Sequence, residues 1–223
     1  MTFPALEYVG VDDWVLDQAR GKSVLHLGCA GDYLAYGADA CLHGRIVGVA
    51  RCVWGVEIDA VRLSQVQRWF PEDDERRVRY ICGDVTKLQE LQIDRSFEVI
   101  LAGSIIEHVA NPGEMLQGMR DLCDRDSRVI IVTPSAFGLL HFLRVALRKT
   151  EQVHPQHTCW FSIQTLTELC ARYGLKPSLW LTGYGWRPPS LKWSLQKRFG
   201  VPFFKLLPQL GGSLIGVFHL VPQ

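Results

Sequence analysis

The sequence predicts an α/β fold, because short apolar runs typical of buried strands alternate with segments of helical spacing along most of the 223 residues. Such alternation is typical of strand–helix–strand units, which build a mostly parallel sheet covered by helices on both faces. The last two apolar runs have no clear helix directly after the first of them, so one strand is expected to pair antiparallel at an edge. We therefore predict a Rossmann-like, doubly wound sheet of seven strands, mostly parallel, with an antiparallel edge strand.

The expected strands share an apolar run bounded by glycine, proline or polar residues. They cover residues 23–28, 52–58, 77–84, 97–104, 127–134, 176–184 and 212–221. The expected helices cover residues 42–50, 60–70, 112–123 and 162–174. Pro112 suits the first turn of a helix, Ser162 suits an N-cap, and Gly174 suits a C-terminal stop.

Composition and charge narrow the classes of function. The chain is 48% hydrophobic and 21% charged with a formal net charge of +1, which is ordinary for one folded domain and gives no basis for a nucleic-acid groove. No apolar run approaches the roughly 20 residues of a membrane span, and the first residues lack a signal-peptide pattern. The seven cysteines are scattered without a C-x-x-C pair. We therefore expect a cytoplasmic protein without a disulfide framework or a zinc site.

Four loops are expected to meet at the carboxyl edge of the sheet, where open α/β sheets bind their ligands. These loops follow Leu27, Val56, Cys82 and Leu101. The first loop departs from the G-x-G-x-x-G fingerprint of dinucleotide sites, because Ala30 and Tyr33 stand at the second and third glycine positions. The residues alone leave open whether this loop is a ligand cradle, in which Gly28 admits close backbone approach, or a plain turn.

The next two loops each offer a carboxylate at a strand end. Glu57 could accept both ribose hydroxyls of a nucleoside, with Asp59 as the weaker candidate, or it could be a solvated acid. Asp84 could accept the amino group of an adenine, or it could cap the short helix that begins near Val85. The residues do not decide between these alternatives.

The fourth loop carries Glu107 and His108 between a strand and an Asn-Pro-Gly turn that opens a helix. With this loop, the stretches VLHLGCAGD, VWGVEID, ICGDVTKL, FEVILAGSIIEHVANPGEML and RVIIVTPS follow one another in the order of class I S-adenosylmethionine-dependent methyltransferases, which the chain resembles from about residue 23 to 135. The stretch HPQHTCWFSIQTLTELCARYGL continues the resemblance. The chain resembles small methyltransferases encoded among bacterial genes for polysaccharide and glycolipid biosynthesis, which share the Leu42-His43 pair and the EH-x-x-N-P-G stretch.

The resemblance implies S-adenosyl-L-methionine as cofactor, a ligand without phosphate that needs no pyrophosphate cradle. It implies that Glu57 holds the ribose, Asp84 the adenine edge, and Gly28 with residues 102–104 the methionine part. The complete set of implied cofactor-binding residues is Gly28, Cys29, Ala30, Glu57, Ile58, Asp84, Val85, Ala102, Gly103 and Ser104.

The expected reaction is methyl transfer to a small molecule or glycan acceptor, at oxygen. Attack by a hydroxyl calls for a base, and the pKa of histidine lies near neutrality. We expect His108 and His157 as candidate bases, with Glu107 as an orienting or cofactor-contacting acid. Either histidine could instead be a structural hydrogen-bonding group. His154 and His157 could suggest a metal pair, but no nearby third ligand is apparent in the sequence, and no metal site is predicted.

One domain is expected over residues 1–223, with lid-like inserts at about 137–160 and 186–210. Both inserts mix apolar and basic residues, so they suit a lid over the acceptor, and they also suit a surface that rests on a membrane.

Two other classes of protein remain as alternatives. The family usually has an acidic residue at position 26 and glycines at positions 30 and 32, where this chain has His26, Ala30 and Asp32. These departures favour, as an alternative, a binding or scaffold protein that keeps the methyltransferase fold without turnover. A nicotinamide-dependent oxidoreductase is disfavoured by the failed glycine fingerprint.

Overall fold

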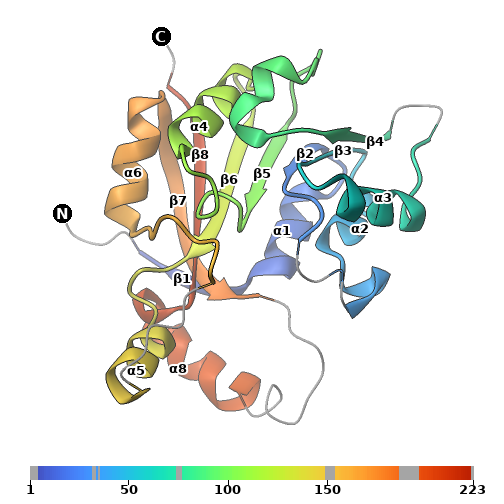
Figure 1. Cartoon of the computed structure of the whole chain (residues 1–223). Coiled ribbons are helices and arrows are strands. Elements are labelled where there is room, and N and C mark those ends of the chain that lie inside the picture. The colour runs from blue at the N-terminus through green and yellow to red at the C-terminus, as the bar shows by residue number, and fades with distance from the viewer. Residues whose placement is uncertain are drawn as a thin grey trace.

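The computed structural model describes residues 5–31, 34, 36–73, 77–148, 154–185 and 196–221, which form one sheet flanked by helices (Figure 1). The strands are β1 (Glu7–Gly10), β2 (Ser23–Leu27), β3 (Cys52–Glu57), β4 (Val78–Cys82), β5 (Val99–Gly103), β6 (Arg128–Pro134), β7 (Leu175–Tyr184) and β8 (Ser213–Leu220). The helices are α1 (Val11–Ala19), α2 (Leu42–Val47), α3 (Ala60–Trp69), α4 (Pro112–Asp121), α5 (Leu139–Arg148), α6 (Ile163–Arg172) and α8 (Val201–Leu206). Short 3₁₀ turns cover Ala38–Ala40 (η2), Val85–Glu90 (η3) and Pro208–Leu210 (η5), and a π-helical turn covers Gln196–Gly200 (η4).

The strand order is β1-β7-β8-β6-β5-β2-β3-β4, which confirms the predicted Rossmann-like α/β class. Two details differ from the prediction. The sheet has eight strands among the described residues, because the four residues of β1 pair in parallel with β7 at the edge. The antiparallel strand is β8, and it lies between β6 and β7 instead of at the edge. A four-residue strand is too short for a periodic signal, and periodicity says nothing about strand order.

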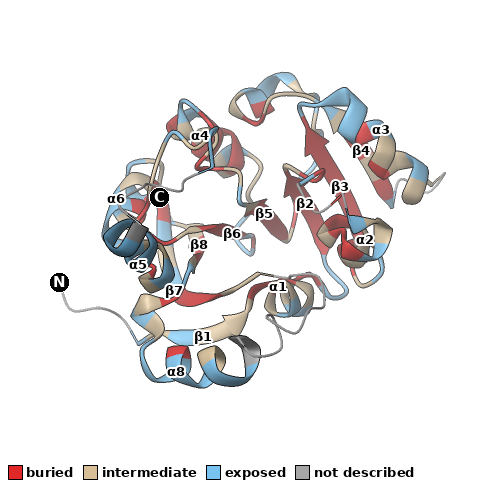
Figure 2. Cartoon of the chain, turned by 60° about the horizontal axis from the view of Figure 1, so that its bottom comes forward, coloured by how far each residue is buried: buried red, intermediate tan, exposed pale blue. Residues whose placement is uncertain are grey.

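The central strands of the sheet are buried, as the red colour of β2, β3 and β5 in Figure 2 shows. In β2, Leu25 and Leu27 belong to a cluster that includes Trp54 and Met115, whereas Val24 belongs to the cluster on the opposite face. The alternation follows from the two-residue repeat of a strand. Since helices cover both faces, all five residues of β2 are buried, and the strand reads as a continuous apolar run.

Three residues predicted to begin or end helices do so in the structure. Ser162 caps α6, because its hydroxyl accepts the backbone N–H of Thr165 at 3.2 Å while the Thr165 hydroxyl accepts the N–H of Ser162. Gly174 follows α6 with a φ of 74°, in the left-handed region that favours glycine. Pro112 opens α4 as expected.

Helices α5 and α8 lie beyond the carboxyl edge of the sheet, below the arrowheads of β6 and β7 in Figure 1. Helix α8 packs on β1, where the rings of Tyr8 and Phe204 stack with centroids 5.2 Å apart. Helices α5 and α8 belong to the two segments expected to be lid-like inserts, at about 137–160 and 186–210; residues 149–153 and 186–195 lie outside the described chain, and the lid role stays a prediction. Among the described helices, none is long and apolar enough to cross a membrane.

Candidate active site

The loop after β2 turns tightly beneath the fourth loop. Gly28 has a φ of 70°, and its N–H donates to the carbonyl of Val56 at 2.9 Å. A Cβ at this position would lie 3.1 Å from Cδ1 of Ile105, so a larger residue would be both strained and crowded. Glycine at 28 therefore lets the first and fourth loops approach each other at the carboxyl edge.

Glu57 joins the first loop to the second. It ends β3 with 9% of its surface exposed. One carboxylate oxygen accepts the N–H of Ala30 at 3.2 Å, and the other accepts the N–H of Asp59 at 3.1 Å. Each oxygen has two lone pairs, so the carboxylate can accept further hydrogen bonds from a ligand. Cys29 and Ala30 are buried beside it, whereas Ile58 is 65% exposed.

Asp59 and Asp84 both cap helices. Asp59 accepts the N–H groups of Val61 and Arg62 and so begins α3. Asp84 accepts the N–H and the hydroxyl of Thr86, at 2.9 and 2.8 Å, through the same oxygen, Oδ1. The capping alternative for Asp84 is thus present in the structure. Both capping hydrogen bonds end on Oδ1, so they do not use Oδ2, the other carboxylate oxygen. Val85, the next residue, is buried.

The end of β5 has an unusual backbone. Ala102 is buried, Gly103 is half-buried, and Ser104 is exposed. Ser104 has a φ of 52°, which is uncommon for a residue with a side chain, and its N–H donates to the carbonyl of Val132 at 2.8 Å. This turn sends the chain out of the sheet toward Glu107 and His108.

Glu107 is a buried acid with one satisfied oxygen. Its Oε2 accepts the hydroxyl of Thr133 at 2.9 Å, while Oε1 makes no hydrogen bond within the described chain. Burial raises the pKa of Glu107 to about 7, against the smaller opposing effect of hydrogen bonds from its own backbone and from Thr133. The side chain is therefore poised between its charged and neutral forms near neutral pH.

His108, His154 and His157 form one cluster. The ring centroids lie 4.6 Å apart for His108 and His157, 5.2 Å for His108 and His154, and 5.3 Å for His154 and His157. Burial lowers the pKa of His157, and the neighbouring His108 and His154 lower it further. The sequence showed no third group beside His154 and His157; the structure places His108 there.

Thr158 fastens the two loops that carry this cluster. Its N–H donates to the carbonyl of Glu107 at 2.8 Å, and its hydroxyl donates to the carbonyl of Val109 at 2.9 Å. These contacts flank His108 on one loop and adjoin His157 on the other. Neither Thr158 nor Thr133 was singled out from the sequence, since a lone threonine has no pattern that distinguishes it.

His26 lies apart from the loops, inside the sheet. Its Nδ1 is 3.2 Å from Nδ1 of His43 on α2, and both rings are buried. The residue that departs from the family pattern is therefore part of the core. His26 could have been recognised as buried from its place in the apolar run SVLHL, but nothing in the sequence named its partner.

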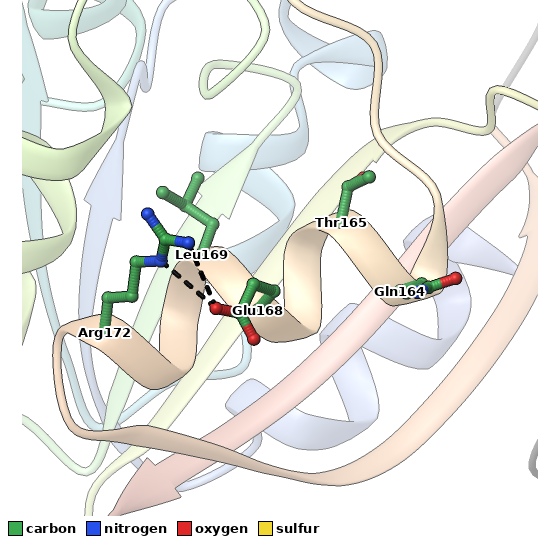
Figure 3. Close-up of a pocket in the computed structure, with 5 residues that line it drawn as sticks. All are labelled: Gln164, Thr165, Glu168, Leu169 and Arg172. Carbon is green, nitrogen blue, oxygen red and sulfur yellow. Dashed lines mark hydrogen bonds and ion pairs between the residues drawn. The ribbon is translucent and has the colours of Figure 1, made fainter. Parts of the chain in front are cut away.

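A separate surface hollow of about 340 Å³ lies along α6 (Figure 3). Gln164, Thr165, Leu169 and the ion pair of Glu168 with Arg172, 3.2 Å apart, line it. All of these except Leu169 are exposed. The hollow shares no residue with the loops at the carboxyl edge, and one side of a single helix offers no enclosed binding site.

Solved structures with this fold include several methyltransferases. A TehB-like SAM-dependent methyltransferase from Corynebacterium glutamicum matches 96% of this chain and 89% of its own, with 17% identity and a TM-score of 0.58. Magnesium protoporphyrin IX methyltransferase from Synechocystis, solved with bound SAH, matches 95% and 80%, with 12% identity and a TM-score of 0.59. The 1,6-didemethyltoxoflavin-N1-methyltransferase of Burkholderia thailandensis matches 95% and 77%, with 18% identity and a TM-score of 0.55. These likenesses show the shared fold.

Comparison at the level of sequence identifies the family. None of the curated proteins compared with the chain matches it. A family model described as a methyltransferase domain matches residues 10–178, which include all four loops of the carboxyl edge and the histidine cluster. The chain therefore belongs to the methyltransferase-domain family.

Proposed function

We propose that the protein transfers a methyl group from S-adenosyl-L-methionine to an oxygen of a small molecule or glycan. The observation that carries this proposal is the buried carboxylate of Glu57, which ties the first loop to the second at the carboxyl edge of β2 and β3. Ligands of open α/β sheets bind at this edge. The structural neighbours from Synechocystis and Burkholderia, both solved with SAH, belong to the same fold.

In this proposal the cofactor is held through its sugar and base. Glu57 accepts the ribose hydroxyls, and Oδ2 of Asp84 accepts the adenine amino group while Oδ1 caps η3. The methionine part passes Gly28, Cys29 and Ala30 on one side and residues 102–104 on the other. The exposed side chain of Ile58 lies next to Glu57, where it can cover the adenine, and Val85 contributes backbone only because its side chain is buried.

Methyl transfer from a sulfonium is an in-line displacement in which the donor is already activated, so the protein mainly aligns the acceptor with the methyl group. An acceptor hydroxyl must also lose its proton, and His108 and His157 are the proposed bases. Glu107 is the proposed orienting acid. It sits one residue before His108, and its Oε1 makes no hydrogen bond within the described chain.

The acceptor is proposed to enter beneath the α5 segment. The insert between β6 and α6 closes at its base, where Ser135 bridges to Phe161 and the N–H of Ala136 donates to the Phe161 carbonyl at 2.9 Å. On α5, Phe142 and Leu147 are 65% and 79% exposed. Apolar side chains of this kind suit a lid over a glycan or glycolipid acceptor, and they suit peripheral contact with the cytoplasmic face of a membrane.

Binding of S-adenosylhomocysteine, measured by calorimetry, tests the cofactor site. Glu57→Ala should weaken binding by about 1–3 kcal/mol, the scale expected when ligand hydrogen-bonding groups lose their partner. Glu168→Ala, which removes an exposed carboxylate on α6, is the matched control and should bind like the parent. Unchanged affinity in Glu57→Ala would show that the ribose is held elsewhere.

A radiolabelled-methyl assay against fractionated metabolites and lipids tests turnover. Transfer of label to a fraction supports the enzyme, and the chemistry of that fraction identifies the acceptor. Binding of the cofactor without transfer to any fraction would favour the scaffold alternative. A thermal shift with NAD in place of S-adenosylhomocysteine would favour the oxidoreductase.

A further inference from the structure

The three histidines of the loop cluster have the spacing of a metal site. One ligand nitrogen from each of His108, His154 and His157 lies within 4.8 Å of the other two. For a tetrahedral ion with Zn–N bonds of about 2.05 Å, imidazole centroids should lie about 5 Å apart. The observed centroid separations of 4.6, 5.2 and 5.3 Å lie close to that value, on either side of it. We propose that His108, His154 and His157 bind a divalent transition-metal ion of the Zn²⁺ class.

The cluster is built by two loops that are joined to each other. His154 and His157 occupy a turn closed by a hydrogen bond from the N–H of His157 to the carbonyl of His154 at 3.0 Å. Thr158 then anchors this turn to the carbonyls of Glu107 and Val109, on both sides of His108. Hydrogen bonds from the backbone and from the Thr158 hydroxyl thus hold the turn that carries two ligands against the loop that carries the third, which is the preorganisation that metal sites depend on.

The hydrogen bonds of the rings are consistent with coordination. Nδ1 of His157 is buried and makes no hydrogen bond with the described residues, so a bond to an ion would satisfy it. Nδ1 of His154 accepts the N–H of Gln156 at 3.3 Å, a long contact. His154 is exposed, so its ring can turn to present a nitrogen to an ion. We expect His154 to contribute less affinity than His108 and His157.

The donor set selects the class of ion. Neutral imidazole suits Zn²⁺, Cu²⁺ and Ni²⁺, whereas Mg²⁺ and Ca²⁺ prefer oxygen ligands. No carboxylate or thiol of the described chain belongs to this cluster. Three protein ligands leave a fourth position open, which is the arrangement of catalytic zinc sites, in contrast to the four protein ligands of structural ones.

The role of the ion, unlike its binding, rests on the proposed methyl transfer. An acceptor hydroxyl at the open position would have a lowered pKa and lose its proton to water more readily. A C–O bond then forms to the methyl carbon while the C–S bond breaks and its electron pair stays on sulfur. A coordinated nitrogen cannot also accept a proton, so the loaded cluster would activate the acceptor through the ion, in place of a free imidazole base.

Titration of the untagged, chelator-treated protein with Co²⁺, followed by visible spectroscopy and Zn²⁺ competition, tests the site. We expect one equivalent of Co²⁺, bound with the strong visible bands of four- or five-coordinate cobalt and displaced by Zn²⁺. His108→Asn and His157→Asn should weaken binding at least about 100-fold. Thr158→Val, which removes the hydroxyl bonds to Glu107 and Val109 but keeps the backbone N–H bond to Glu107, should weaken it about 10-fold, as changes outside the ligand set do.

His219→Asn is the matched control, because His219 lies near the end of β8 and outside the cluster; it should bind Co²⁺ like the parent. Equal binding by the parent and by His108→Asn, no binding by the parent, or thiolate-to-cobalt bands would each overturn the metal site. Affinity for S-adenosylhomocysteine, measured on the same samples, separates the two proposals. The histidine variants should keep it, whereas its absence in the parent would contradict the proposed function and leave the metal result standing.

Discussion

Two groups of histidines in this molecule show how differently one side chain can be used. His26 on β2 and His43 on α2 are buried in the core, with their rings stacked at 5.4 Å and their Nδ1 atoms 3.2 Å apart. Burial lowers the pKa of His26 to about 4 and lowers that of His43 well below its ordinary value, with His26 adding to the second shift. The loop cluster of His108, His154 and His157 is half-buried to exposed, on loops beyond the strand ends.

The location of a histidine in the fold thus decides whether it can do chemistry. A hydrogen bond between two Nδ1 atoms needs one ring to donate and the other to accept, so at least one ring of the buried pair must be neutral. The buried pair is closed to solvent and fixed by packing. The cluster lies where an acceptor or an ion can reach it. The buried pair is therefore expected to determine stability, and the loop cluster to determine ligand binding.

Removal of a buried ring should have the largest effect on folding. His43 packs against His26 and against Tyr80, whose ring centroid is 5.3 Å away. His43→Ala would leave a cavity and an unpartnered Nδ1 on His26, so the free energy of unfolding should fall by about 2–4 kcal/mol. Urea denaturation measures this. A loss below 1 kcal/mol would mean that the pair does not hold α2 on the sheet.

A side chain that crowds His43 should have the second-largest effect on the free energy of unfolding. A Cβ at Gly55 would lie 2.7 Å from Sγ of Cys29 and 2.9 Å from Cε1 of His43. Gly55→Ala should lower the free energy of unfolding by about 1–3 kcal/mol through overpacking. Because Cys29 belongs to the first loop, affinity for S-adenosylhomocysteine should fall as well. Full stability and full affinity together would show that this interior adjusts more easily than the geometry indicates.

The free energy of unfolding should depend on pH because of the buried histidine pair. Between pH 6.5 and about 4 the unfolded chain binds a proton at His26 and the folded chain does not. Stability should therefore decrease as the pH falls through this range, by at most about 1.4 kcal/mol per pH unit for each histidine. Above pH 6.5 both states are neutral and His26 contributes no slope.

His26→Leu isolates this contribution when urea denaturation is repeated at several pH values. Glu107 adds a slope of opposite sign between pH 4.5 and about 7, because burial raises its folded pKa. Since the parent and the variant both keep Glu107, the difference between their curves reports the histidine pair. Parallel curves would contradict the assignment.

The smallest change in stability should come from the loop cluster. His154 is exposed and contacts the cluster through its ring, so His154→Ala should alter the free energy of unfolding by no more than about 0.5 kcal/mol. Set beside His43→Ala in the same urea series, this variant gives the sharpest contrast between the two groups. A loss comparable to that of His43→Ala would remove the distinction altogether.

The elements that could be predicted from sequence are those with strong local patterns. Strands buried on both faces, such as VLHL and VIIV, appear as nearly unbroken apolar runs. The helix starts at Ser162 and Pro112 are encoded within one turn of the chain. The strand β1 was missed because its stability comes from pairing with β7, whose partner residues lie far along the chain. Local periodicity carries no such information.

The site was predictable to the extent that each residue follows a strand. Glu57 and Glu107 could be placed by that rule, and the structure finds both buried at strand ends or just beyond them. The meeting of His108 with the His154–His157 turn could not be predicted, because it depends on how Thr158 joins two loops separated by more than 40 residues. The pairing of His26 with His43 was hidden for the same reason.

The placement of β1 bears on the order in which the molecule can assemble. Strand β1 pairs with β7, where Glu7 lies opposite Leu181. Strand β8 must insert between β6 and β7. On the ribosome, the half of the sheet formed by β2 to β5 has all its strands once Gly103, the last residue of β5, has emerged. The segment at residues 7–10 must wait for synthesis to pass β7 before it finds its neighbour. The edge formed by β1 is thus among the last parts of the sheet to be completed.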